Sequence, residues 1–500
     1  MNLRVSIVFR VLIASVGLLL PLMTVPAVGA PAFNLFFHFA TNTSFLPEFP
    51  SSEPTVSYWT AVVPNGPPWI VVATVSGGPL GQGRLMRHRA DDSFREDVVV
   101  FTNSTLLGSE PQGPLVEPGI SLPGIGTGLM FGTCRRGGAA NFGGVFRVRN
   151  DGGFYQILRS FAADGRDGRF PNGGLTYVPA DGFLYGTTPE GGTNNAGTLF
   201  RIKPDGTEYS VLRHFTGSVL DGRSPNGSLA LVGSFLFGTT SLGGVDDLGT
   251  VFRYQPSTTA YSIRWHFGSD PSLGTLPSGG LISVAGALYG LASHGGTNEA
   301  GTLYRYIEIG QSYQAFSASK HFGATPEDAR HPWGRLVAFP PQFPGQIFDT
   351  RLVGVSAQGG EFNKGTVFAI GSNPEVLHSF GGGEEDGELP LSSVTICEGV
   401  ALGVTARGGR NDAGIMFRVG LGYNVTPAWT RSSIAGSTAS FQLQGEQRVR
   451  YAVQSSPDGT LTNWTRLATI LADNLGGATY TTSITNTPGD KGRLFRFVWP

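Results

Sequence analysis

The chain has 500 residues and is almost neutral, with 35 Lys and Arg against 36 Asp and Glu and a formal net charge of −1. Charged residues make up 14 % of it, against ~25 % in a typical globular domain. Without a basic patch, this composition argues against binding to nucleic acid or to an anionic membrane surface. Gly contributes 74 residues, roughly double its usual share of ~7 %. These glycines often stand in doublets between apolar runs, which indicates turns and not disorder.

The first thirty residues have the pattern of a targeting segment. Arg4 and Arg10 precede an apolar run at 11–22, and small residues follow at 28–30. This order is typical of a secretory signal peptide, cleaved after Ala27 or Ala30. The alternative is an uncleaved anchor, but the run is shorter than the ~20 residues that cross a bilayer. We expect residues 1–30 to be a signal peptide, and the mature protein to be secreted or at the cell surface, or periplasmic, without a membrane span.

One phrase then recurs along the chain. LYGTT at 184–188 is followed by GTLFR at 197–201, LFGTT at 236–240 by GTVFR at 249–253, and LYGLA at 288–292 by GTLYR at 301–305. The aromatic residue of the second phrase moves from Phe200 to Phe252 to Tyr304, a step of 52 residues each time. A fixed period of this size indicates a solenoid, a propeller or an array.

Each unit contains four short runs rich in β-branched and aromatic residues, which predict strands. In the third unit they lie at 174–178, 183–187, 198–202 and 209–215, and PADG and KPDG turns separate them. Gly in such turns supplies the positive φ that tight hairpins need. Four strands joined by hairpins form one antiparallel sheet, and such sheets arranged radially are the blades of a β-propeller.

The number of units and the two ends of the repeat region predict how the ring closes. Weaker copies at 71–87, 129–147, 351–369 and 401–418 bring the total to seven. The seventh unit lacks a fourth strand, while the segment at 33–39, FNLFFHF, resembles one. Closure also removes edge strands that would pair with other chains. We therefore predict a seven-bladed β-propeller over 31–420, closed by the N-terminal strand. Alternating apolar and polar residues over 421–500 predict a small C-terminal β-sandwich.

Polar loops gather at one end of the predicted ring. In an up-and-down blade, the loop that enters the first strand lies on the same face as the loop between the second and third strands. The entering loops carry recurring carboxylates, which are Asp164, Asp167, Asp221, Asp270, Asp328 and Asp386. Calcium needs six to eight oxygen ligands, and each loop offers one or two carboxylates. Solvated turn aspartates are therefore favoured over a calcium site.

Histidines recur as well, at His214, His266 and His321 before a phenylalanine, and at His378 two residues before Phe380. Fourth-strand positions lie at the outer rim of a propeller, too far apart to share a metal. We expect these side chains to pack and hydrogen-bond within their own blades. His38 fits the same pattern and supports strand completion.

The sequence predicts no catalytic, cofactor-binding or metal-binding residue. The chain has no G-x-S-x-G, H-E-x-x-H or phosphate-binding P-loop sequence. Paired carboxylates at the ring axis are left open as a glycosidase arrangement. Cys134 and Cys397 stand in distant units, so two isolated buried thiols are favoured over a disulfide.

The units resemble the GloVer tandem repeat, whose pattern LYGTT-x-x-GG-x(4)-GT-L/V-F, L-x-S/H-F and DG-x-x-P-x-GGL is matched closely over about 160–305. The first, sixth and seventh units depart from it. The resemblance implies an exported bacterial repeat protein with a surface-attachment device and no established activity. The C-terminal segment looks like the small β-sandwich modules of other exported proteins.

Three functions stay open from the sequence. The first is an exported, monomeric propeller that binds a carbohydrate or a surface protein at its loop-rich end. The second is a glycan hydrolase or lyase with carboxylates near the ring axis. The third is a structural envelope protein. The fold does not choose among them, because function depends on sites.

Overall fold

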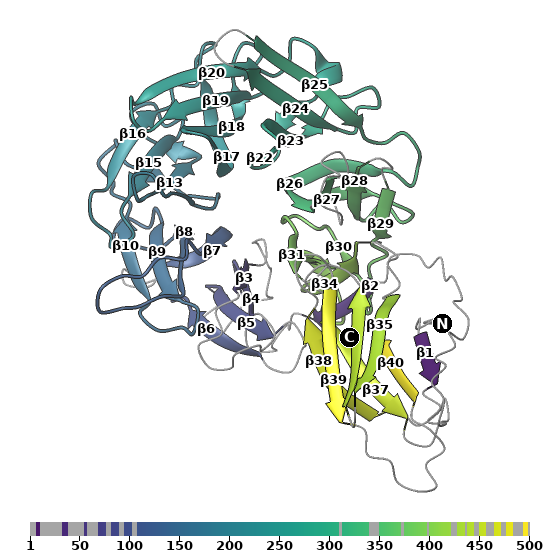
Figure 1. Ribbon diagram of the computed structural model, residues 1–500. Helices are drawn as coiled ribbons and strands as arrows, with labels where there is room; N and C mark the ends of the chain where they lie inside the picture. The colour runs from purple at the N-terminus through teal and green to yellow at the C-terminus, as the bar shows by residue number, and fades with distance from the viewer. Residues whose placement is uncertain are drawn as a thin grey trace, which may run out of the picture.

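The computed structural model describes residues 69–76, 82–88, 95–102, 108–308, 314–339, 350–371, 375–396 and 400–421 in full. For the strands outside these ranges it gives the backbone alone. Seven antiparallel sheets surround a common axis, with one strand of each sheet nearest the axis and one at the outer rim (Figure 1). The predicted seven-bladed β-propeller is confirmed.

The blades follow one another in chain order. Blade 1 is β3 (Thr55–Ser57), β4 (Trp69–Thr74), β5 (Arg84–Arg89) and β6 (Arg95–Val100). Blade 2 is β7 (Ser109–Val116), β8 (Leu129–Arg136), β9 (Gly144–Arg149) and β10 (Gln156–Ser160). Blade 3 is β12 (Thr176–Val178), β13 (Phe183–Thr188), β15 (Thr198–Ile202) and β16 (Ser210–His214). Blade 4 is β17 (Gly222–Val232), β18 (Phe235–Gly243), β19 (Thr250–Gln255) and β20 (Ala260–His266).

Blade 5 follows a 3-10 turn η1 (Pro271–Leu273) and contains β21 (Thr275–Pro277), β22 (Ile282–Val284), β23 (Ala287–His294), β24 (Thr302–Ile309) and β25 (Tyr313–His321). Blade 6 is β26 (Ala329–Phe339), β27 (Arg351–Gly359), β28 (Thr366–Ile370) and β29 (Glu375–Ser379). Blade 7 is β31 (Thr395–Cys397), β32 (Val400–Val404), β34 (Ile415–Gly420) and β2 (Phe33–His38). Two short ladders, β11 (Gly168–Arg169) with β14 (Glu190–Gly191) and β30 (Gly387–Glu388) with β33 (Arg407–Gly408), extend blades 3 and 7.

The recurring phrase is the middle hairpin of a blade, and its glycine makes room for its aromatic ring. Gly186 of LYGTT lies opposite Phe200 of GTLF in the ladder. A Cβ at Gly186 would lie 2.6 Å from Cζ of Phe200. The same opposition recurs in blades 2 and 4–7 as Gly132–Phe146, Gly238–Phe252, Gly290–Tyr304, Gly354–Phe368 and Gly403–Phe417.

Blade 1 obeys the same limit on space between these two positions, although both the glycine and the aromatic residue are replaced. Val72 stands at the glycine position and faces Met86 at the aromatic position. The flexible, unbranched side chain of Met86 leaves space for Val72, and an aromatic ring would fill that space. The two positions thus change together, which explains why the first unit departs from the repeat and still forms a blade.

The threonines of the phrase lock the same hairpin. The hydroxyls of Thr188 and Thr198 are 2.8 Å apart, as are those of Thr240 and Thr250. These side chains are fully buried. A buried hydroxyl without a partner would be costly, so the pairing explains why both phrases carry Thr at these positions.

The N-terminal strand closes the ring as the sequence predicts. β2 pairs antiparallel with β34, with Phe33 opposite Val419 and His38 opposite Ile415. Its register shifts between Leu35 and Phe37. The third and fourth strands of every other blade carry a shift at the same place, for example between Leu199 and Phe200 in blade 3. The joining strand therefore has the irregularity of an ordinary fourth strand.

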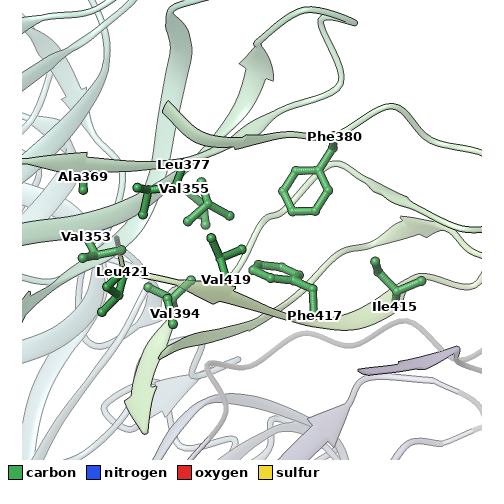
Figure 2. Close-up of a cluster of buried hydrophobic side chains, with 12 residues drawn as sticks. Val353, Val355, Ala369, Leu377, Phe380, Val394, Ile415, Phe417, Val419 and Leu421 are labelled. Atoms are coloured by element: carbon green, nitrogen blue, oxygen red, sulfur yellow. The ribbon is translucent and has the colours of Figure 1, made fainter. Parts of the chain in front are cut away.

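Apolar side chains between neighbouring blades form the core. Between blades 6 and 7, Val355, Leu377 and Phe380 face Val419 and Phe417 (Figure 2). The rings of Phe380 and Phe417 meet edge to face at 5.0 Å. Similar clusters fill the other joints, so apolar packing joins each blade to its neighbours.

The C-terminal strands form two further antiparallel sheets, the arrangement of a small β-sandwich. One contains β35 (Ala428–Ala435), β36 (Thr438–Gln444) and β39 (Gly477–Ser483). The other contains β37 (Arg450–Ser456), β38 (Thr465–Leu471), β40 (Leu494–Val498) and β1 (Ile7–Arg10), which pairs with β40. β1 lies within the predicted signal peptide, whose cleavage stays a prediction, as do the domain boundaries at 30 and 420. Within the described residues, no helix is long and apolar enough to cross a membrane.

Candidate functional site

The two sets of polar loops do meet at one end of the ring, which we call the loop-rich end. Gly168 in an entering loop pairs with Gly191 in the loop between the second and third strands. The amide of Gly192 also donates to the carbonyl of Asp167, at 2.8 Å. Blade 7 repeats the arrangement through Gly387 and Gly408. The opposite end carries the short turns within blades, and we call it the hairpin end.

The recurring aspartates are buried clamps between blades. One Asp221 oxygen accepts from Arg213 Nη2 (2.7 Å) and from the Thr216 amide (2.9 Å). The other accepts from the Gly222 amide (2.9 Å) and from the Tyr261 hydroxyl (2.7 Å). Burial acts to raise the pKa of Asp221, but hydrogen bonds from Tyr261 and Arg213 outweigh it and lower that pKa. The carboxylate thus joins the outer strand of blade 3 to blade 4.

The same clamp recurs at other joints. Asp167 accepts from Arg159 and Tyr209, and Asp328 from Lys320. The expectation that these aspartates are solvated is wrong for Asp167 and Asp221, which are each 3 % exposed. Their oxygens are satisfied by donors of the protein itself, because a carboxylate is buried only when it is paired and hydrogen-bonded.

Asp164, Asp270 and Asp386 complete the predicted set. Asp164 accepts from the amides of its own turn, and Asp270 caps the 3-10 turn η1. Asp386 has the clamp position of blade 7 and lies 3.2 Å from Nε2 of His378. Among the residues described in full, no three His, Cys, Asp or Glu side chains are grouped as a metal would need.

The histidines lie on outer strands, as expected from the sequence. The ring nitrogen Nδ1 of His321 accepts from the Thr297 amide at 3.3 Å. Nδ1 of His214 and of His266 is buried and has no partner within the described part of the chain. His378 differs from them in its position. It pairs with Val367 in the ladder, as Arg213 pairs with Leu199 in blade 3, so His378 is the equivalent of Arg213. It faces Asp386 as Arg213 faces Asp221.

Cys134 is a free, buried thiol in blade 2. Burial raises its pKa to about 12, so the reactive thiolate is scarcely populated at neutral pH. The side chain of Cys397 lies outside the described residues. The sequence-based preference for an isolated thiol is confirmed for Cys134.

Several of the described loops at the loop-rich end carry exposed apolar side chains. Seven large hydrophobic residues of the described ranges are exposed, and only Phe154 lies in a turn at the hairpin end. Four lie in loops at the loop-rich end, and two lie on or beside the innermost strands of blades 6 and 7. We call these six the loop-end apolar residues; they are Val219, Leu220, Val245, Phe362, Trp333 and Leu391.

A cavity of about 320 Å³ opens at the hairpin end between blades 4 and 5. Its apolar wall includes Phe235 and Phe237 of β18 and Tyr306 of β24. Its polar wall is Arg253, Gln255 and Glu308. This cavity was not predicted from the sequence, since this end was expected to carry only tight hairpins.

An ionic network lies beside this cavity. Glu308 accepts from Arg253 and lies 3.1 Å from Nη2 of Arg264. The Tyr306 hydroxyl donates to the second oxygen of Glu308 at 3.0 Å and accepts from Arg264 Nε at 3.3 Å. Burial is the main cause that raises the pKa of Tyr306, so the phenol stays protonated at neutral pH. Two cations against one carboxylate leave the site with a net positive charge.

Comparison with known proteins identifies a repeat over part of the chain and no activity. No curated protein matches the sequence. Similar solved structures include the tricorn protease, at 11 % identity over 89 % of this chain and 40 % of the protease, with a TM-score of 0.37. TolB from Acinetobacter baumannii is similar at 10 % identity over 70 % and 79 %, with a TM-score of 0.33. An ulvan lyase is similar at 10 % identity over 75 % and 94 %, with a TM-score of 0.41.

At these identities and scores, none of the three likenesses supports a functional conclusion, and the chain spans less than half the length of the tricorn protease. The profile of the Gloeobacter/Verrucomicrobia repeat matches residues 117–346, from β8 through β26. This match confirms the resemblance carried by the LYGTT and GTLF phrases. Over residues 117–346, the chain therefore carries repeats of the Gloeobacter/Verrucomicrobia type.

Proposed function

We propose that this protein is an exported binding protein that docks a partner protein at the cell surface through its loop-rich end. One observation carries the proposal: among the described residues, four of the seven exposed large apolar side chains lie in loops at that end. Leu220 is 77 % exposed, Val219 61 % and Val245 59 %. Single exposed apolar residues are ordinary, but Val219, Leu220 and Val245 lie in two loops of the same blade end, and such a group favours a binding surface.

The chemistry of these side chains favours a protein over a polysaccharide. Four of the six loop-end apolar residues are aliphatic. Sugars stack on aromatic rings, whereas aliphatic side chains gain by burial against apolar protein surface. Trp333, which is 42 % exposed on the innermost strand of blade 6, favours a polysaccharide as the second candidate.

The recurring polar groups of the same end stabilise the ring itself. Asp247 pairs with Arg223, and Glu385 with Arg410. The hypothesis of a hydrolase or lyase gains no observation from these contacts. It stays an alternative that assays with polysaccharide substrates would test.

Site-specific photo-crosslinking tests the proposal. A benzophenone amino acid replaces Leu220 in the full mature chain, and intact cells of the source organism are irradiated. The matched control places the same group at Phe154, which is 50 % exposed at the hairpin end. We expect a discrete protein adduct from position 220 that is lost in a Val219→Ser/Val245→Ser background.

Two results would overturn the proposal. The first is the same adducts from both positions, and the second is no adduct from position 220. A polysaccharide partner would instead appear as retention on a glycan array that Trp333→Ala abolishes, and this result would replace the protein with the second candidate.

A further inference from the structure

The joint between blades 4 and 5 differs at the hairpin end from the joints that follow blades 1 and 2. In those two joints, the Arg that follows Met86 or Phe146 bonds to a backbone carbonyl of the next blade. Arg87 donates to the carbonyl of Asn150, and Arg147 to that of Pro204, at 2.9 and 3.2 Å. Arg253 instead meets the carboxylate of Glu308.

Two charged residues create this difference. Glu308 stands where blades 3 and 4 have Pro204 and Pro256. Each of the three lies four residues after the aromatic residue that pairs with Gly186, Gly238 or Gly290 in its own blade. Arg264 stands two residues before His266, where blade 3 has Leu212. The two substitutions come from opposite sides of one joint and meet in a salt bridge.

The network leaves donors available to a ligand. Nη1 of Arg253 bonds to Glu308, while its Nε and Nη2 have no partner among the described residues. Its guanidinium lies 4.5 Å above the ring of Phe235. Gln255 Oε1 accepts a hydrogen bond from the Thr258 hydroxyl. The amide NH₂ of Gln255 has no partner in the described part of the chain. An Arg side chain over an aromatic ring presents its donors in a fixed plane.

We propose that this cavity binds a small organic anion, with one carboxylate carried on a six-membered ring. The carboxylate would accept from Arg253, since an Arg fork matches carboxylate geometry. The ring would lie against Phe237 and Tyr306, whose centroids are 6.3 Å apart and form one wall. A cavity of about 320 Å³ holds one such ring. The site lies on the end opposite the loop-end apolar residues and is independent of the proposed docking function.

The test is calorimetric titration of the full mature chain with four probes. Two are anions, glucuronate and benzoate, and two are their neutral counterparts, glucose and benzyl alcohol. We expect at least one anion to bind at least about tenfold more tightly than its neutral counterpart, which corresponds to ~1.4 kcal/mol. Preference for glucuronate would identify a sugar acid, and preference for benzoate an aromatic acid.

Variants separate binding from folding. Arg253→Gln removes the free donors and leaves Arg264 to neutralise Glu308, so we expect binding of the preferred anion to weaken about tenfold or more. The matched control is Arg201→Gln, the same position in blade 3, where the guanidinium lies over Phe183 and does not line this cavity. Val232→Phe fills the cavity without changing a charge and should abolish binding while the melting temperature stays within a few degrees.

Three results would overturn the proposal. The first is that neither anion binds at up to about 10 mM. The second is equal binding of an anion and its neutral counterpart. The third is that Arg253→Gln and Arg201→Gln weaken binding equally. In each case the charged network would serve only to join the two blades.

Discussion

The clamp at Asp221 gives the sharpest test of how the blades are held together. Replacement by Asn keeps the shape of the side chain but leaves one oxygen acceptor where the carboxylate has two. Its NH₂ group then faces donors, either Arg213 and the Thr216 amide or Tyr261 and the Gly222 amide. At least two hydrogen bonds are lost and their donors remain buried.

The expected cost follows from the burial of this carboxylate, whose side chain is 4 % exposed. Breaking a buried charged pair by removing one partner costs about 3–5 kcal/mol. At ~2.1 cal/mol/K per residue, a unit the size of the propeller has an unfolding entropy of about 0.8 kcal/mol/K. Asp221→Asn should therefore lower the melting temperature by about 4–6 °C.

Asp247→Asn is the matched control. Asp247 also accepts from an arginine, Arg223, and from a backbone amide, that of Gly243. Its side chain is 54 % exposed, and an exposed ion pair contributes only about 0–1 kcal/mol. Calorimetric melts of both variants at low scan rate check the difference, and equal shifts for the two would refute the argument that burial makes the clamp.

Three further predictions follow from the same contacts. Deletion of residues 33–38 should lower the melting temperature sharply and promote aggregation in light scattering, because β34 loses its partner and becomes an edge strand; an unchanged melt would contradict closure by β2. Gly238→Ala should destabilise the propeller by about 1–3 kcal/mol in chemical denaturation, since its Cβ would lie 2.4 Å from Cζ of Phe252, and Phe252→Met in that background should recover part of the loss. In a Cys397→Ser background, Cys134 should react with a thiol reagent only on unfolding, because burial raises its pKa to about 12; rapid labelling of the native protein would show that the site is open.

The sequence predicted the architecture because the determinants of a blade are local and repeated. The glycine that faces Phe200, the paired threonines and the hairpin glycines all lie within one unit, so their period is visible in the sequence. The missing fourth strand could also be found, because β2 has the same run of residues as the other fourth strands. The aspartates were placed at the correct end, but their burial depends on partners from a second blade, such as Tyr261 for Asp221. Spacing within one unit does not show which residues of different blades meet.

The joint between blades 4 and 5 shows which signal in the sequence was missed. At its loop-rich end, the Arg, Asp and Tyr of the clamp are replaced together by Trp265, Pro271 and Phe316, and the two rings stack at 4.3 Å. At its hairpin end, Arg264 and Glu308 introduce charges that the neighbouring units lack.

This joint has therefore lost its ionic contact on one face of the ring and gained one on the other. A structural ion pair alone needs no cavity, no unpaired guanidinium nitrogens and no second cation. In a repeat protein, the positions that keep the period maintain the fold. Pairs of departures that meet across one joint mark where a single chain differs from its own repeat. Here Arg264 and Glu308 form such a pair, and Glu308 lines the cavity.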